Sequence, residues 1–454
     1  EVWRIVNDIT RPKSGEKSAA IIVNNEEITD AAVVAEKFNL YFLQKIKDLR
    51  DRVDDRLQEN PFERLKNALV GRNLDFNLST VSESVVKKII TNMTNKKAVG
   101  RDAIGMDVIK TGGDALIAPL TFIINTSIRE STFPNAWKHA RVIPLLKKGN
   151  PKDLSNYRPI SILPATSKVL EEVVRRQVSD FFEKNNLLPE HQHGFRPSRS
   201  STTALLSLQN KLIDTKQRKE HTATTLWDLS AAFDTLDHGI FLEKLKVYGF
   251  GPNSVEWFRS YLSDRTQHVE VNGQVSSTHG VPYGSPQGAV LSPLIFTIFV
   301  ADLPLWAKHS TIFSYADDTT TNICHSDLQE VKRMTEDDAK RVLAFMNTNF
   351  LVANPNKTKV MLFRWNESAR DTNDQPFSIQ IGNSQIEEST SEKLLGIHLS
   401  NNLRWDRHVN EVKSSLNQRL VVLRHVSYCI PRESLRELAF GLVLSKIRYG
   451  IPVY

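Results

Sequence analysis

Residues 311–323 read Thr311-Ile-Phe-Ser-Tyr315-Ala316-Asp317-Asp318-Thr-Thr-Thr-Asn-Ile323. On both sides of Asp317 and Asp318 the residues are apolar, aromatic or β-branched, which are the types that β-strands favour. The pattern therefore predicts a hairpin whose tight turn presents two adjacent carboxylates. Neighbouring strand residues face opposite ways, so one carboxylate can face a cleft and bind Mg²⁺, which prefers oxygen ligands. A solvated Asp-Asp turn is the alternative, because Asp favours turns.

Another carboxylate lies towards the end of a second predicted strand, residues 222–230. Asp228 stands where a β-branched run ends and a turn of small residues begins. This position can expose the carboxylate together with neighbouring backbone carbonyls. Taken alone, Asp228 could equally cap a helix.

A basic loop lies between two predicted short strands within residues 140–161. The first strand ends at Lys147 and Lys148, and Arg158 belongs to the second. A hairpin of this kind can place cationic groups on a triphosphate. A solvated charged loop is the alternative.

Small residues are concentrated between Gly280 and Ala289, where they would let the backbone approach a base or sugar closely. Ser292 and Pro293 then predict the N-cap and first position of an apolar helix. Further along, residues 393–399 predict a strand that is interrupted at Gly396.

The composition is that of a globular protein. Hydrophobic residues make up 40% and charged residues 24% of the 454 residues, and this length allows two to four structural units. The net charge of +7 hints at a polyanionic partner. Two cysteines, Cys324 and Cys429, support neither a disulfide framework nor a cysteine-based zinc site. No apolar run is long enough for a membrane span and no signal peptide is recognisable, so we expect an intracellular protein without a membrane partner.

The ordered set of motifs resembles that of reverse transcriptases. Its members are Trp227-Asp228-Leu-Ser-Ala-Ala-Phe233-Asp234, Gly284-Ser-Pro-Gln287-Gly288, Tyr315-Ala-Asp317-Asp318, Asn354-Pro-Asn-Lys357-Thr358 and Leu394-Leu-Gly396. Upstream, Tyr157-Arg158-Pro159-Ile160-Ser161 and Gly194-Phe195-Arg196 resemble the fingers of the same family. Within that family, the chain is most similar to LINE-type (non-LTR) retrotransposons of the jockey-like kind. Residues 1–42 resemble the connector that follows the endonuclease in the polyproteins of those elements.

The resemblance implies an α+β fold in the form of a right hand. We expect fingers, a palm whose antiparallel sheet bears helices on one face, and a helical thumb that is truncated at Tyr454. The expected boundaries are a connector or N-terminal extension over 1–78, fingers with the first palm elements over 79–220, the palm with the catalytic motifs over 221–390, and the primer-grip region with a partial thumb over 391–454.

The resemblance also implies an RNA-directed DNA polymerase that uses two Mg²⁺ ions, with Mn²⁺ as a possible substitute. Its expected partners are an RNA template, a DNA primer, dNTPs and an endonuclease domain in the full-length polyprotein. By similarity, the expected catalytic residues are Asp228, Asp317, Asp318 and Lys357. The expected metal ligands are Asp228, the carbonyl of Leu229, Asp317 and Asp318. The residues expected to bind the dNTP are Lys147, Lys148, Arg158, Phe233, Gln287 and Gly288.

Three alternatives remain open at this point. One is an intron-encoded or bacterial reverse transcriptase, and another is an inactive copy that only binds RNA. The third is an RNA-templated RNA polymerase. Phe233 weighs against the third, because a bulky aromatic at that position suits deoxynucleotides, and the complete carboxylate set disfavours the inactive copy. If the host is eukaryotic, we expect the protein in nucleus and cytoplasm.

Overall fold

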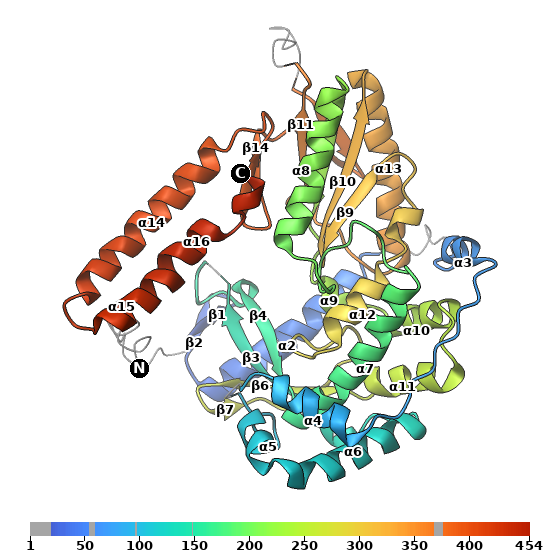
Figure 1. The fold of residues 1–454 in the computed structure, drawn as a ribbon, viewed down its shortest axis with the longest axis vertical. Helices are drawn as coiled ribbons and strands as arrows, with labels where there is room; N and C mark the ends of the chain where they lie inside the picture. The colour runs from blue at the N-terminus through green and yellow to red at the C-terminus, as the bar shows by residue number, and fades with distance from the viewer. Residues whose placement is uncertain (1–19, 54–59, 96–97, 148, 367–375) are drawn as a thin grey trace.

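The computed structural model describes residues 20–53, 60–95, 98–147, 149–366 and 376–454. Lys148 and residues 1–19 of the expected connector lie outside these ranges. Helices and strands alternate irregularly along the described chain, so the predicted α+β class is confirmed. Figure 1 shows the chain, with the helices near the C-terminus forming an arm beside the sheets. Within the described ranges, no helix combines the length and the apolar character that crossing a membrane requires.

The amino-terminal third is mainly helical. Asp30 caps the first long helix by accepting hydrogen bonds from the backbone N–H groups of Ala32 and Val33. The elements are β1 (Ile21–Val23), β2 (Glu26–Ile28), α2 (Ala31–Arg50), α3 (Glu63–Leu69), α4 (Glu83–Asn92), α5 (Met106–Gly112) and α6 (Asp114–Arg129).

The middle of the chain carries both strands of the predicted basic hairpin and the strand that precedes Asp228. The elements are η2 (Asn135–Trp137), β3 (His139–Leu146), η3 (Leu154–Asn156), β4 (Tyr157–Ile162), α7 (Ala165–Lys184), α8 (Ser201–Gln217), β5 (His221–Trp227), α9 (Ala232–Thr235), α10 (His238–Val247), α11 (Pro252–Leu262), β6 (Thr266–Val271), β7 (Gln274–Val275), β8 (His279–Gly280) and α12 (Ser292–Phe299).

The last third carries the predicted carboxylate hairpin and ends in helices. The elements are η4 (Leu303–Leu305), β9 (Thr311–Tyr315), β10 (Asp318–His325), α13 (Leu328–Thr348), β11 (Lys359–Phe363), β12 (Ser378–Ile381), β13 (Ser384–Glu387), β14 (Ser391–Leu394), β15 (Ile397–Ser400), α14 (Asp406–Val426), α15 (Arg432–Ala439), the π-helix η6 (Phe440–Leu444), α16 (Ser445–Arg448) and η7 (Ile451–Val453).

Two local predictions were wrong. Ser292 is the first residue of α12 rather than its cap, because the backbone is already helical at Leu291, with φ −81° and ψ −26°. Its hydroxyl donates to the Pro286 carbonyl at 2.8 Å. The strand expected over 393–399 is instead the hairpin β14–β15. Its turn is formed by Leu395 and Gly396, whose φ values of 45° and 83° are left-handed, so the chain reverses direction there.

A four-stranded antiparallel sheet, here called the central sheet, has the order β11-β5-β10-β9. Alternate side chains of its strands pack on opposite faces. On one face Phe313 and Met361 pack with Leu212 of α8. On the other face, Val360 packs into the main core, to which α13 contributes Val342. Helices therefore cover both faces, and the expectation of helices on one face only was wrong.

A second sheet has the order β4-β3-β6-β7, with β8 also pairing with β6. The pairing of β3 with β4 is antiparallel and that of β3 with β6 is parallel. Helix α2 packs on this sheet through Phe38 and Phe42, as its apolar spacing predicts. The buried amide of Asn39 adds hydrogen bonds to Ser276 and to Gln267, and these fix the position of α2 on the sheet.

Candidate active site

The predicted carboxylate hairpin is confirmed. Strands β9 and β10 pair with Asp318 opposite Tyr315, and Ala316 occupies the turn with a left-handed φ of 59°. In the neighbouring strand pair Thr319 lies opposite Trp227. Asp228 follows Trp227 and Asp318 precedes Thr319, so antiparallel pairing brings these carboxylates to the same end of the central sheet. Asp317 lies beside them in the turn.

A short backbone pairing brings Lys357 to Asp228. The Asn354 N–H donates to the Asp228 carbonyl, and the Ser230 N–H donates to the Val352 carbonyl, each at 2.8 Å. The Lys357 ammonium consequently lies 3.5 Å from an Asp228 carboxylate oxygen. Leu229 faces Ala353 in this pairing, and neither of the two hydrogen bonds uses the Leu229 carbonyl, which was the expected additional metal ligand.

The carboxylates repel one another electrostatically. Burial raises the pKa of Asp317, and the charge of Asp228 adds to this effect, although Arg158 opposes it. Burial, followed by the charges of Asp317 and Asp228, raises the pKa of Asp318 to about 6. Partly buried like charges of this kind are relieved by a cation, and oxygen donors suit Mg²⁺ or Mn²⁺. The donor set therefore fits the expected divalent metal.

Basic side chains border this carboxylate group. Lys147 directly follows the first strand of the basic hairpin, which ends at Leu146, one residue earlier than predicted, and Arg158 lies on the second strand, as predicted. Burial lowers the pKa of Lys147, and the nearby charges of Lys45, Arg158 and Lys357 lower it further. Because these cations act on one another and Arg158 also acts on Asp317, the fold gathers them around one region.

The other expected nucleotide-binding residues, Phe233, Gln287 and Gly288, lie on two segments that are joined by backbone hydrogen bonds. The Ser285 N–H donates to the Phe233 carbonyl, and the Gly284 N–H donates to the Leu236 carbonyl, each at 2.9 Å. The Phe233 ring is partly buried, with its centroid 4.5 Å from that of Phe296.

Gln287 and Gly288 lie against the second strand of the basic hairpin. The Ser161 N–H donates to the Gln287 carbonyl at 2.8 Å. A Cβ on Gly288 would lie 2.2 Å from the Ser161 carbonyl oxygen. The close approach that this glycine permits is thus one between two protein segments.

Two residues of this region were missed by the sequence reasoning. Asp234 hydrogen-bonds the Gln287 side chain, and the charge of Lys45 acts on both Lys147 and Asp234. Asp234 follows Phe233 directly, so its place in the motif was an available signal. Lys45 lies on α2, in a segment interpreted only as connector, and its local pattern gave no indication of the site.

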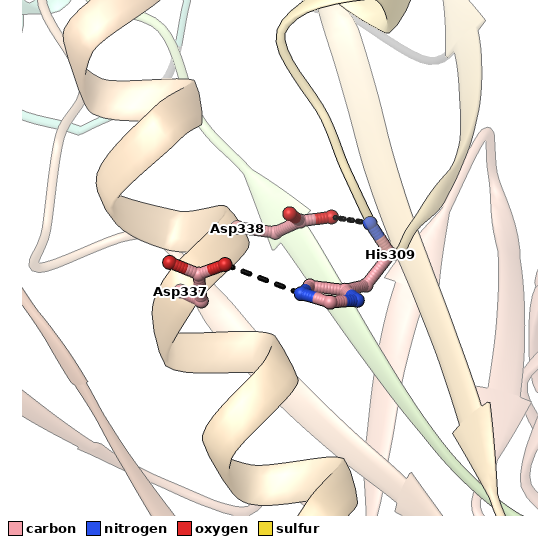
Figure 2. Close-up of side chains that lie close together, drawn as sticks. All are labelled: His309, Asp337 and Asp338. Carbon is pink, nitrogen blue, oxygen red and sulfur yellow. Dashed lines mark hydrogen bonds and ion pairs between the residues drawn. The ribbon is translucent and has the colours of Figure 1, made fainter.

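A separate cluster contains His309, Asp337 and Asp338 (Figure 2). Among the described residues, it is the one group of this kind whose potential ligand atoms all lie within 4.8 Å of one another. Asp338 accepts hydrogen bonds from the backbone N–H groups of Lys308, His309 and Ser310, and Asp337 pairs with Arg341 as well as His309. These hydrogen bonds and the ion pair with Arg341 already occupy the carboxylate oxygens, and they fasten the loop before β9 to α13.

A sequence profile described as reverse transcriptase (RNA-dependent DNA polymerase) matches residues 145–399. The chain belongs to the reverse transcriptase family. The match contains each carboxylate described above, the basic hairpin from Leu145 onward and Lys357. The resemblance inferred from the ordered motifs is therefore confirmed.

Individual reverse transcriptases agree with this assignment. The RNA-directed DNA polymerase from mobile element jockey of Drosophila melanogaster is 28% identical over 397 residues, covering 83% of this chain and 42% of the relative. The probable RNA-directed DNA polymerase from transposon X-element of the same species is 26% identical over 406 residues, covering 86% and 41%. The chain thus spans about two fifths of the length of these relatives, and its similarity to the jockey polymerase confirms the predicted jockey-like relationship.

Proposed function

We propose that this chain is the polymerase region of a non-LTR retrotransposon protein and that it extends a DNA primer on an RNA template. The observation that carries the proposal is the meeting of Asp228, Asp317 and Asp318 at one end of the central sheet, bordered by basic side chains. Membership of the reverse transcriptase family and the names of the jockey and X-element relatives support it.

The proposal includes a hand-shaped organisation. The connector occupies 1–78, the fingers with the first palm elements 79–220, the palm 221–390, and the primer-grip region with a partial thumb 391–454. The central sheet would be the floor of the palm, and α14 to α16 would belong to the thumb (Figure 1). Strands β3 and β4 of the basic hairpin would belong to the fingers, whereas β6 to β8 of the same sheet fall within the range of the palm.

Asp228, the Leu229 carbonyl, Asp317 and Asp318 would hold two Mg²⁺ ions. When bound, two such ions activate the primer 3′-hydroxyl and stabilise the leaving pyrophosphate in an in-line displacement. The chain's own groups bind and orient the nucleotide: Lys147, Lys148 and Arg158 would neutralise the triphosphate. Lys357, which lies 3.5 Å from Asp228, would act near the leaving group.

The remaining nucleotide contacts would come from Phe233, Gln287 and Gly288. A ring beside the sugar leaves no room for a 2′-hydroxyl, so Phe233 would favour dNTPs over rNTPs. The full-length polyprotein would add an endonuclease domain, and the whole would act inside the cell on its RNA template and DNA primer, in nucleus and cytoplasm if the host is eukaryotic.

Primer extension on an RNA template with dNTPs and Mg²⁺ tests the function. We expect the wild-type chain to extend the primer and Asp228→Asn to lose at least about a hundredfold in rate, since a metal ligand is worth several kcal/mol in the transition state. Glu387→Gln is the matched control, because it also removes one carboxylate but lies exposed on β13.

Three results of the primer-extension test would contradict this proposal. Extension by Asp228→Asn at the wild-type rate would refute the assignment of the carboxylates. RNA binding without any extension by the folded wild-type protein would favour the inactive RNA-binding copy, and extension with rNTPs alone would favour an RNA polymerase.

A further inference from the structure

Arg50, the last residue of α2, lies outside the segment that matches the reverse transcriptase profile and is nevertheless enclosed by it. Its side chain is only 10% exposed. The guanidinium pairs with the Asp237 carboxylate at 2.6 Å and donates to the Thr235 carbonyl at 2.9 Å. Thr235 is the last residue of α9 and Asp237 caps α10, so both partners lie in the segment that follows Asp228, and α2 is fastened directly to that segment.

The same guanidinium lies between two aromatic rings from other segments. Its central carbon is 3.8 Å from the centroid of the Tyr283 ring and 4.2 Å from that of Phe350. Tyr283 belongs to the loop that leads to Gln287. Phe350 precedes the backbone that pairs with residues 228–230 and carries Lys357. Arg50 therefore contacts three segments, each of which bears a residue of the candidate active site.

Only arginine can make this set of contacts. Its planar guanidinium stacks on aromatic faces and still offers several N–H donors at its edge, whereas the lysine ammonium is a compact point charge. A partly desolvated cation between two rings also holds them at a fixed separation. These properties suit a residue whose task is to keep three segments in register.

We propose that Arg50 is a positioning residue of the polymerase site, through which α2 sets the relative placement of the segments bearing Asp228, Gln287 and Lys357. The inference rests on the proposed function for its catalytic consequence. It extends the working polymerase unit upstream of the matched segment, because α2 then contributes to catalysis as well as to packing.

Kinetics provide the first test. Arg50→Ala should lower kcat about 10- to 100-fold, because small misplacements of reacting groups are costly, with a smaller change in KM for dNTP. Arg50→Lys should fall between Arg50→Ala and the wild type. Lys47→Ala is the matched control: Lys47 is an exposed cation one turn earlier on α2, and its loss should leave kcat unchanged.

Chemical rescue makes the kinetic test sharper. A cavity of about 1070 Å³ is lined by Arg50, Tyr283 and Phe350, so a small cation can reach the space that the deleted side chain leaves. Guanidinium at millimolar concentration should restore part of kcat in Arg50→Ala, whereas urea should not. A guanidinium response of the same size in Lys47→Ala would overturn the proposal, as would an unchanged kcat in Arg50→Ala.

A second readout does not depend on turnover. Amide hydrogen exchange in Arg50→Ala should become faster in three places, residues 232–238, 280–285 and 347–353, while Lys47→Ala should behave like the wild type. Faster exchange confined to α2 would overturn the positioning role even in an inactive protein. If exchange changes as expected but the wild type extends no primer, the contacts of Arg50 stand and the proposed function fails.

Discussion

The side-chain amide nitrogen of Gln287 lies 2.8 and 2.7 Å from the two carboxylate oxygens of Asp234. A carboxylate only accepts hydrogen bonds, so the contact fixes which end of the Gln287 amide faces Asp234. The amide oxygen of Gln287 is thereby left for another partner. If Gln287 binds the incoming nucleotide, Asp234 determines how it is presented.

The Asp234–Gln287 pair predicts a pH dependence. Burial raises the pKa of Asp234 to about 6, although the Gln287 hydrogen bond and the charges of Lys45 and Lys147 oppose the shift. Protonation would remove one acceptor, so KM for dNTP should rise as the pH falls through about 6. Asp234→Asn should abolish this inflection, and the measurement is KM across the pH range in both proteins.

The same group should affect stability with a definite sign. Because the pKa of Asp234 in the folded protein exceeds its ordinary value of 3.8, the folded state binds this proton more tightly than the unfolded state. Its contribution to stability is therefore fully present below that ordinary value and is lost as the pH rises to about 6. Thermal unfolding measured between pH 3.8 and about 6 should therefore show that wild type loses more stability with rising pH than Asp234→Asn does. An equal dependence of stability on pH in the two proteins would contradict the prediction.

Arg158→Ala tests the basic hairpin. If Arg158 binds the triphosphate, KM for dNTP should rise about tenfold, the size expected for losing a hydrogen bond to a charged group, while duplex affinity changes less. Arg129→Ala on the exposed surface of α6 serves as control. A fall in duplex affinity with an unchanged KM would identify the hairpin as a nucleic-acid contact instead.

Phe233→Val separates two roles for this aromatic side chain. As a gate beside the sugar, Phe233 should exclude rNTPs by about a hundredfold, since a displaced ribonucleotide loses its in-line geometry. The substitution would then raise rNTP incorporation relative to dNTP. Because the ring also packs on Phe296, some loss of thermal stability is expected. Equal losses for both sugars together with that instability would show that Phe233 acts only as a core residue.

Gly194→Ala tests whether the close backbone contact between Gly194 and Ala316 positions the neighbouring Asp317. A Cβ on Gly194 would lie 2.3 Å from the backbone nitrogen of Ala316, and backbone cannot yield as a flexible side chain can. The substitution should displace Asp317 and lower kcat about a hundredfold for a shift of the order of 1 Å, with little change in KM for dNTP.

The matched control is Gly280→Ala, where an added Cβ meets nothing within 4 Å and φ is not left-handed. Its kcat and thermal stability should stay near those of the wild type. If Gly194→Ala also retains the wild-type kcat, the turn can move aside, and the contact with Ala316 does not position Asp317.

The local elements were predictable because their signals lie within a few residues of one another. Alternating β-branched and apolar residues around Asp317 and Asp318 specify a hairpin, since strand propensity and the tight turn both act over this short range. The apolar spacing of Phe38 and Phe42 likewise specifies the buried face of α2. The sequence thus determined most elements, the α+β class and the candidate carboxylates.

Tertiary structure alone decided which distant segments meet. Asp228 and Lys357 are brought together by the pairing of residues 228–230 with 352–354, and no local pattern encodes that register. The same holds for Gly194 beneath Ala316 and for Arg50 between Tyr283 and Phe350. Such contacts depend on how whole faces pack, because packing selects one register among many that local propensity would allow.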